Sequence, residues 1–144
     1  MPTAAIVGGG VIGSAWASRF LLYGWDVRFY DPAPNAEQVL HAVLGKARRW
    51  VPQIVEALPG EGSLTVCSTL SDAVATSDWI QESTPERLEI KHAVLSQIQA
   101  ACSDAAIVGS STSGFMPSEL QAGSERPEQI LVAHPYNPVY LLPI

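Results

Sequence analysis

The stretch IVGGGVIG, at residues 6–13, constrains the fold of this 144-residue chain more than any other feature. A short apolar run, Ala4–Val7, precedes its glycines and is typical of a buried parallel strand. The segment Val11–Tyr23 follows them and predicts a helix, which Gly24 is expected to close with a left-handed cap. The sequence therefore predicts a strand, a glycine-rich turn and a helix in direct succession.

The rest of the chain continues this alternation. Further strands are predicted at Asp26–Tyr30, Leu64–Cys67, Trp79–Gln81, Ala106–Gly109 and Gln129–Ala133. Further helices are predicted at 35–51, with a short second one to residue 57, near 71–75, and at 84–101. Asn35 and Thr84 are expected to cap the two long helices. Because such strands need right-handed crossovers, we expect residues 1–144 to form one α/β domain, a doubly wound Rossmann-type, mostly parallel sheet with helices on both faces.

The glycines match the pattern G-x-G-x-x-G at Gly8, Gly10 and Gly13. Between a strand and a helix, this pattern is typical of a dinucleotide-binding turn. Gly8 is expected to permit the tight turn, Gly10 the close approach of a pyrophosphate to the helix N-terminus, and Gly13 the close packing of helix on strand. The residues expected to border the cofactor here also include Gly9, Val11 and Ile12.

The second predicted strand leads into Asp31, which lies 18 residues past Gly13. At that position a carboxylate accepts hydrogen bonds from the ribose hydroxyls of the adenosine. The 2′-phosphate of NADP would meet a like charge there, and the following Pro32-Ala33-Pro34 offers no arginine to offset it. The sequence therefore predicts NAD, rather than NADP, as the cofactor.

Composition excludes several other classes of protein. A net charge of −6 argues against a nucleic-acid binder, which needs a basic face. Cys67 and Cys102, outside any metal-ligand spacing, are interpreted as reduced thiols of a cytoplasmic protein, so no metal site is expected. The N-terminal apolar run has no preceding Lys or Arg and holds four glycines, so it is not a signal peptide, and no stretch is long enough to span a membrane.

Three later stretches carry a resemblance to a known family: IQESTPERLEIK, SSTSGFMPSEL and HPYNPVYLLP. Together they resemble the N-terminal domain of the 3-hydroxyacyl-CoA dehydrogenase superfamily, and within it they look most like the carnitine 3-dehydrogenases. Fatty-acyl enzymes more typically carry an aromatic pair after the histidine, where this chain has Pro135 and Tyr136. The resemblance implies an NAD-dependent oxidoreductase that converts a 3-hydroxyl to a ketone, with L-carnitine as the first candidate substrate and 3-dehydrocarnitine as its product.

His134 is the candidate general base. It follows the predicted strand Gln129–Ala133, at the carboxyl edge of the sheet where ligands of such folds bind, and Pro135 and Pro138 would stiffen its loop. Imidazole is suited to accept a hydroxyl proton near neutral pH while hydride leaves for a nicotinamide ring. The resemblance implies the same role for His134. His41 and His92 lie within predicted helices and are assigned no chemistry.

The resemblance also implies roles for three further residues. Ser113 is expected to hydrogen-bond the substrate hydroxyl, although the residues alone are also typical of a turn. Glu86 and Lys91 are expected to contact the nicotinamide end of NAD, although charges at this spacing are also typical of a solvated helix face.

In the family, a glutamate just downstream orients the histidine, and a mainly helical second domain completes the substrate pocket and forms the homodimer interface. Both would fall beyond Ile144, so we expect residues 1–144 to be the NAD-binding part of a longer protein, which LLPI would join to the next domain. Isolated, this part is expected to have little or no turnover.

Several alternative functions fit the same sequence. A 3-hydroxyacyl-CoA dehydrogenase, for example for 3-hydroxybutyryl-CoA, needs cations for the CoA phosphates, and between Asp31 and Gly62 the chain offers Lys46, Arg48 and Arg49. L-Gulonate 3-dehydrogenase is a related alternative, and a non-catalytic NAD-binding module is one of another class. For carnitine, Tyr136 and Tyr140 are candidates to hold the trimethylammonium group by cation–π attraction.

Overall fold

The computed structural model describes residues 1–142 of the chain. Its strands are β1 (Thr3–Val7), β2 (Asp26–Tyr30), β3 (Leu64–Val66), β4 (Trp79–Glu82), β5 (Ile107–Ser110) and β6 (Ile130–Val132). Its α-helices are α1 (Val11–Leu22), α2 (Ala36–Trp50), α3 (Leu70–Val74), α4 (Leu88–Ala101) and α5 (Pro117–Gln121). Two 3-10 turns, Val51–Gln53 and Pro127–Gln129, complete these elements.

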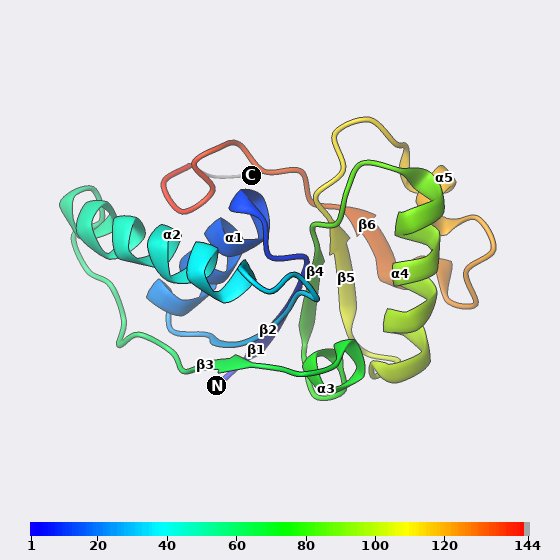
Figure 1. Cartoon of the computed structure of the whole chain (residues 1–144), viewed down its shortest axis with the longest axis horizontal. Coiled ribbons are helices and arrows are strands. Elements are labelled where there is room, and N and C mark those ends of the chain that lie inside the picture. The colour runs from blue at the N-terminus through cyan, green and yellow to red at the C-terminus, as the bar shows by residue number, and fades with distance from the viewer. Residues whose placement is uncertain (143–144) are drawn as a thin grey trace.

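All six strands pair in parallel in one sheet, in the order β3-β2-β1-β4-β5-β6. Helices α1 and α2 cover one face of this sheet, and α3, α4 and α5 cover the other (Figure 1). The expectation of a doubly wound Rossmann-type α/β domain is therefore confirmed.

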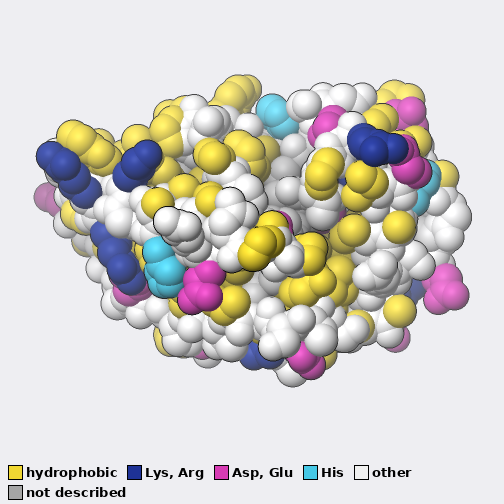
Figure 2. Space-filling view, viewed as in Figure 1, with side chains coloured by type: hydrophobic (Ala, Val, Ile, Leu, Met, Phe, Trp, Pro, Cys, Tyr) yellow, Lys and Arg dark blue, Asp and Glu magenta, His cyan; other side chains and the backbone are white. Residues whose placement is uncertain are grey.

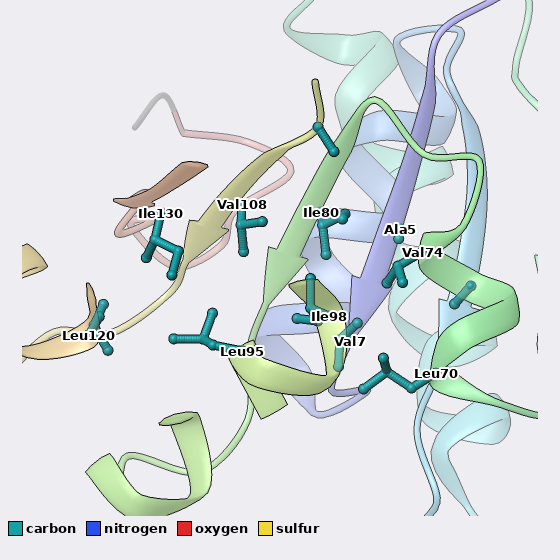
Figure 3. Close-up of a cluster of buried hydrophobic side chains, with 12 residues drawn as sticks. Ala5, Val7, Leu70, Val74, Ile80, Leu95, Ile98, Val108, Leu120 and Ile130 are labelled. Atoms are coloured by element: carbon teal, nitrogen blue, oxygen red, sulfur yellow. The ribbon is translucent and has the colours of Figure 1, made fainter. Parts of the chain in front are cut away.

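The two faces of the sheet bury different side chains of the same strands. Ile6 on β1 packs with α1 and α2, whereas its neighbours Ala5 and Val7 pack toward α3 and α4. Figure 3 shows the second cluster, in which Ile80, Leu95, Ile98 and Val108 meet between sheet and helices. Because each fully buried aliphatic side chain stabilises by about 1.5–3 kcal/mol, these two layers account for much of the driving force for folding.

The strands end in register along one edge of the sheet. Val7 pairs with Glu82, Glu82 with Ser110, and Ser110 with Val132. The loops that follow β1, β4, β5 and β6 therefore leave the sheet at the same level. The order of the strands reverses between β1 and β4, and at such a point open α/β sheets bind their ligands.

The structure corrects several predicted element boundaries. Helix α4 begins at Leu88 rather than at Thr84-Pro85, because the N–H and hydroxyl of Thr84 both donate to Glu82 instead of capping a helix. Asn35 does precede α2, but its side chain makes no capping hydrogen bond. The predicted short helix reaching residue 57 is only a 3-10 turn at 51–53.

Helix α5 was missed by the sequence analysis. It begins with Pro117 at its first position, and the Glu119 carboxylate accepts a hydrogen bond from the N–H of Met116 at 2.8 Å. Proline at the first helical position followed by an acidic residue is a recognised start signal, but the serines and glycines before it favoured a loop.

None of the helices within residues 1–142 combines the length and apolarity needed to cross a bilayer. The LLPI segment, predicted to lead into a further domain, falls partly on Pro143 and Ile144, which lie outside the described residues.

Gly13→Ala is expected to destabilise the fold sharply. A Cβ at Gly13 would lie 1.8 Å from the Gly8 carbonyl oxygen, so α1 would have to move away from the turn. We expect urea denaturation to show a loss of about 1–3 kcal/mol or more, the usual range for overpacking. The matched control is Gly45→Ala on α2, where nothing lies within 4 Å and the helix should gain about 0.5–1 kcal/mol. Equal effects of the two substitutions would contradict the packing argument.

Candidate cofactor and active site

The glycine turn after β1 has the geometry that its sequence predicts. Gly8 has a φ of +101°, and a Cβ there would lie 2.6 Å from the carbonyl oxygen of Ser83. Because Gly13 has no side chain, α1 can lie directly against Gly8. Nothing lies within 4 Å of the position that a Cβ of Gly10 would occupy, so the N-terminus of α1 is open on that side. An open helix N-terminus favours a phosphate group.

Asp31 fastens this turn to the end of β2. Its Oδ2 accepts a hydrogen bond from the N–H of Gly9 at 2.5 Å, and its Oδ1 accepts one from the N–H of Ala33 at 2.7 Å. Gly9 must lack a side chain, because a Cβ would lie 2.4 Å from the ring of Phe29. Asp31 thus stands at the edge of the sheet beside the glycine turn, where the ribose contact is predicted.

A hollow of about 690 Å³ opens between the glycine turn and α4. Gly8, Gly10 and Asp31 border it on one side, and Leu70, Ile90 and Val94 provide an apolar wall on the other. In Figure 2 the surface is hollowed between the half of the molecule built on α1 and α2 and the half built on α4. Its volume lies in the range of small-molecule sites, and an apolar slot beside a carboxylate suits an adenosine group.

A buried ion pair lies beneath the neighbouring loops. Glu82, at the end of β4, has no solvent exposure, and its Oε1 lies 2.8 Å from the Nζ of Lys91 on α4, which is 1% exposed. The ammonium group also donates to Glu82 Oε2 and to the Thr84 carbonyl oxygen. The Ser110 hydroxyl donates to Glu82 as well. The pair therefore joins β4, β5, α4 and the loop between β4 and α4.

This ion pair contains one predicted site residue, Lys91, and one residue that the sequence did not point to, Glu82. Lys91 is buried and not on a solvated helix face, and its ammonium group binds Glu82 and Thr84; its predicted contact with the cofactor stays a prediction. Glu82 was missed by the sequence analysis. The only signal for it was an acidic residue at the end of a predicted buried strand.

A second hollow, of about 260 Å³, lies at the ends of β4, β5 and β6. Its lining brings together five of the predicted site residues: Ile12, Glu86, Lys91, Ser113 and His134. These residues come from four segments of the chain that are far apart in sequence. Val11 is exposed on α1 and does not line this hollow.

Glu86 lies in the loop before α4, where the Thr112 hydroxyl and the Gly114 N–H donate to its carboxylate. Desolvation acts to raise the pKa of Glu86, but these hydrogen bonds and the charge of Lys91 outweigh it and hold the pKa below its ordinary value. The Glu86 carboxylate is therefore anionic at neutral pH.

His134 is exposed at the rim of this second hollow, with its ring edge-on to Tyr136 at a centroid distance of 6.4 Å. The loop after it is anchored on α1, because Arg19 donates hydrogen bonds to the carbonyl oxygens of Val139 and Leu142, each at 3.2 Å. Val139 is fully buried among the side chains of α1 and α2. Within residues 1–142, no carboxylate hydrogen-bonds the imidazole ring.

The fold and this edge of the sheet define a dinucleotide-binding domain of the Rossmann class. A family model described as "3-hydroxyacyl-CoA dehydrogenase, NAD binding domain" matches residues 3–144. The chain therefore belongs to the 3-hydroxyacyl-CoA dehydrogenase family as an NAD-binding domain, and NAD is its cofactor. The resemblance found in the sequence is confirmed.

Curated relatives agree with this membership. The chain is 59% identical over 145 residues to the L-carnitine dehydrogenase/betainyl-CoA thioesterase of Ruegeria pomeroyi, covering 100% of this chain and 30% of that protein. It is 51% identical over 143 residues to the L-carnitine dehydrogenase of Mesorhizobium japonicum, covering 98% of this chain and 39% of that protein. The chain thus spans less than half the length of these relatives.

Solved structures give the same fold. The 5-formyl-3-hydroxy-2-methylpyridine 4-carboxylic acid 5-dehydrogenase, described as an NAD+-dependent dismutase, superposes with a TM-score of 0.90 at 32% identity, over 99% of this chain and 47% of that one. The 3-hydroxybutyryl-CoA dehydrogenase of Escherichia coli superposes with a TM-score of 0.81 at 23% identity, over 96% of this chain and 30% of that one, and supports the fold alone.

Lys91→Met should lower the free energy of unfolding far more than the loss of a surface ion pair does. It leaves the Glu82 carboxylate buried without its counter-charge, which typically lowers the free energy of unfolding by about 3–5 kcal/mol. The matched control is Arg87→Met, which breaks an exposed pair with Glu89 and should change the free energy of unfolding far less, because solvent screens the two charges. Urea denaturation of both variants, and of Lys91→Met combined with Glu82→Gln, measures the difference. The combined variant should recover part of the loss; if it does not, the buried charge is not its cause.

Proposed function

We propose that the complete protein oxidises the 3-hydroxyl of L-carnitine to the ketone of 3-dehydrocarnitine, with NAD as hydride acceptor and His134 as general base. The observation that carries the dehydrogenase chemistry is the convergence of His134, Ser113 and Glu86 on one hollow beside the dinucleotide turn. The choice of carnitine is supported by relatives that are named for it and match the whole length of this chain.

In this proposal each residue of the second hollow has a separate role in the reaction. The Ser113 hydroxyl hydrogen-bonds the substrate oxygen and holds it near His134, whose ring accepts the hydroxyl proton. The bound NAD supplies the hydride acceptor. The anionic Glu86 lies where a positively charged nicotinamide ring would be stabilised, and Lys91 holds the loop of Thr84 in place through its carbonyl oxygen.

The proposal assigns the adenosine end of NAD to the larger hollow. Asp31 accepts hydrogen bonds from the ribose hydroxyls and repels a 2′-phosphate, and the turn Gly8–Gly13 receives the pyrophosphate. The apolar wall of Leu70, Ile90 and Val94 supports this placement, since it offers the adenine ring a surface that excludes water.

Recognition of the trimethylammonium group is proposed to involve Tyr136, a residue that is 63% exposed and whose ring lies beside that of His134. We propose that a helical domain of the complete protein supplies the remaining contacts, the glutamate that orients His134 and a homodimer interface.

A cytoplasmic location is proposed as well and is supported by the free thiols of Cys67 and Cys102.

A CoA ester is the second candidate substrate, but the cations available for its phosphates are poorly placed. Arg48 is bound to Glu61 at 2.6 Å, and Arg49 lies over the ring of Trp50. In Figure 2, Lys and Arg side chains gather at the α2 end of the molecule, with a further group over α4 on the other half. L-Gulonate as the substrate, and a non-catalytic NAD-binding role, are two further alternatives, and the following experiment distinguishes them.

The test follows the formation of reduced nicotinamide by the complete protein. NAD is offered with L-carnitine, 3-hydroxybutyryl-CoA or L-gulonate in parallel, and we expect turnover with L-carnitine. Turnover with one of the other compounds alone would replace the proposed substrate. Turnover with none of the three would favour the non-catalytic module.

His134→Ala in the complete protein should lower kcat for L-carnitine by about 100- to 10,000-fold, the usual scale for loss of a general base. The dissociation constant for NAD should change little, because His134 lies at the far end of the cofactor path. The matched control is His41→Ala, an exposed position on α2 that should leave kcat unchanged. Wild-type activity of His134→Ala would rule out the assigned base.

Asp31→Ala should weaken NAD binding by roughly tenfold or more, as expected for loss of hydrogen bonds to a charged acceptor. It should weaken NADP binding less, because the repulsion of the 2′-phosphate disappears. Since the substitution also frees the Gly9 N–H, the decisive readout is the ratio of the two dissociation constants, measured by calorimetry. An unchanged ratio would argue against the ribose contact.

A further inference from the structure

Gln81, on β4, is a fully buried amide whose neighbours determine its orientation. The Trp79 indole N–H donates to the Gln81 Oε1 at 3.0 Å, and an indole N–H can only donate, so the atom facing it is the amide oxygen. The amide nitrogen then donates to the Ser111 hydroxyl oxygen at 2.8 Å and to the Ala133 carbonyl oxygen at 3.3 Å. Gln81 therefore links the residue before His134 to the loop after β5.

Gly109 on β5 makes room for this arrangement. A Cβ at that position would lie 2.6 Å from the Trp79 ring and 3.0 Å from the Gln81 Oε1. The absence of a side chain there allows the indole to lie against the sheet and to keep the amide of Gln81 turned as described.

The Ser111 hydroxyl makes a second link, to the Ser83 hydroxyl, with the two oxygens 2.7 Å apart. Ser83 and Ser111 are the first residues after β4 and β5, so the shared register of the strands brings them side by side. Ser83 borders both hollows, the one at the glycine turn and the one at His134, whereas Ser111 borders the latter.

The Ser83–Ser111 pair keeps one hydroxyl hydrogen that no other group of the described residues accepts. Two hydroxyl groups carry two hydrogens, and one of them is used between Ser83 and Ser111. Gln81 presents a donor to Ser111, not an acceptor, so it uses neither hydrogen. Among residues 1–142 neither hydroxyl has another hydrogen-bond partner. One O–H therefore remains for a ligand in the hollow, whichever serine donates to the other.

We propose that this remaining O–H of the Ser83–Ser111 pair binds an acceptor oxygen on the nicotinamide-ribose half of NAD. A dinucleotide that runs from the glycine turn to His134 passes Ser83 and Thr84, because these two residues border both hollows, and the Thr84 hydroxyl is already bound to Glu82. The acceptor is a ribose hydroxyl oxygen or the carboxamide oxygen. The inference rests on the proposed placement of the nicotinamide beside His134, and its test is a binding measurement that is independent of turnover.

The test titrates the complete protein with NAD, ADP-ribose and ADP by calorimetry. Ser83→Ala combined with Ser111→Ala removes the hydroxyl pair and should weaken NAD binding about 3- to 10-fold, the contribution of one neutral hydrogen bond, with ADP binding unchanged. A matching loss with ADP-ribose identifies a ribose hydroxyl as the acceptor, and a loss with NAD alone identifies the carboxamide.

The single variants Ser83→Ala and Ser111→Ala form a second test. Each keeps one hydroxyl whose O–H no longer has a serine partner and stays available to the ligand, so each should weaken NAD binding less than the double serine variant does. Ser96→Ala, at an exposed position of α4 beside a separate hollow of about 380 Å³, controls for removal of a hydroxyl elsewhere.

NAD affinity within twofold of wild type in the double serine variant would overturn the inference, as would equal losses for NAD and ADP. The result is distinguishable from failure of the proposed function. If L-carnitine is not oxidised but the double variant loses NAD affinity selectively, the substrate is wrong and this contact stands. If L-carnitine is oxidised at an unchanged NAD affinity, the contact is wrong and the substrate stands.

Discussion

The Glu82 carboxylate is the group on which the geometry of the site most depends. A buried carboxylate is tolerated only when it is paired and hydrogen-bonded, and Glu82 receives donors from Lys91, Thr84 and Ser110. Satisfying this one charge therefore fixes the end of β4, the end of β5 and the loop into α4. Those same segments carry Ser83, Glu86 and Ser111 into the hollow beside His134.

Two side chains of β4, Glu82 and Gln81, hold the segments of the site in place. Glu82 ties its strand to α4 through charge, whereas Gln81 ties it to β5 and β6 through neutral hydrogen bonds to Ser111 and Ala133. The cofactor turn is held differently, by close backbone packing between Gly8 and Gly13 and by the carboxylate of Asp31. Cofactor turn and candidate base are connected as well, since α1 begins at that turn and its Arg19 anchors the loop that follows His134.

Where sequence reasoning failed, a tertiary contact outweighed a local signal. Thr84-Pro85 has the pattern of a helix start, but the Thr84 hydroxyl donates to Glu82, and α4 begins at Leu88. Glu86 and Lys91 look alike as surface charges in sequence. Only the fold buries Lys91 under Glu82 and leaves Glu86 at the hollow, because α4 turns one side chain inward while Glu86 lies in the loop before it.

By itself the sequence determined the alternation of strands and helices, the glycine turn, the position of Asp31 and the candidate base His134. The first three features depend on local backbone preferences and short spacings, whereas His134 was identified as a candidate base by the resemblance to the family as well as by its place after a predicted strand. The tertiary structure alone decided the ion pair of Glu82 with Lys91 and the hydroxyl pair of Ser83 with Ser111. Such contacts join residues that are far apart in the chain or on different strands, and they exist only because parallel strands end in register at one edge of the sheet.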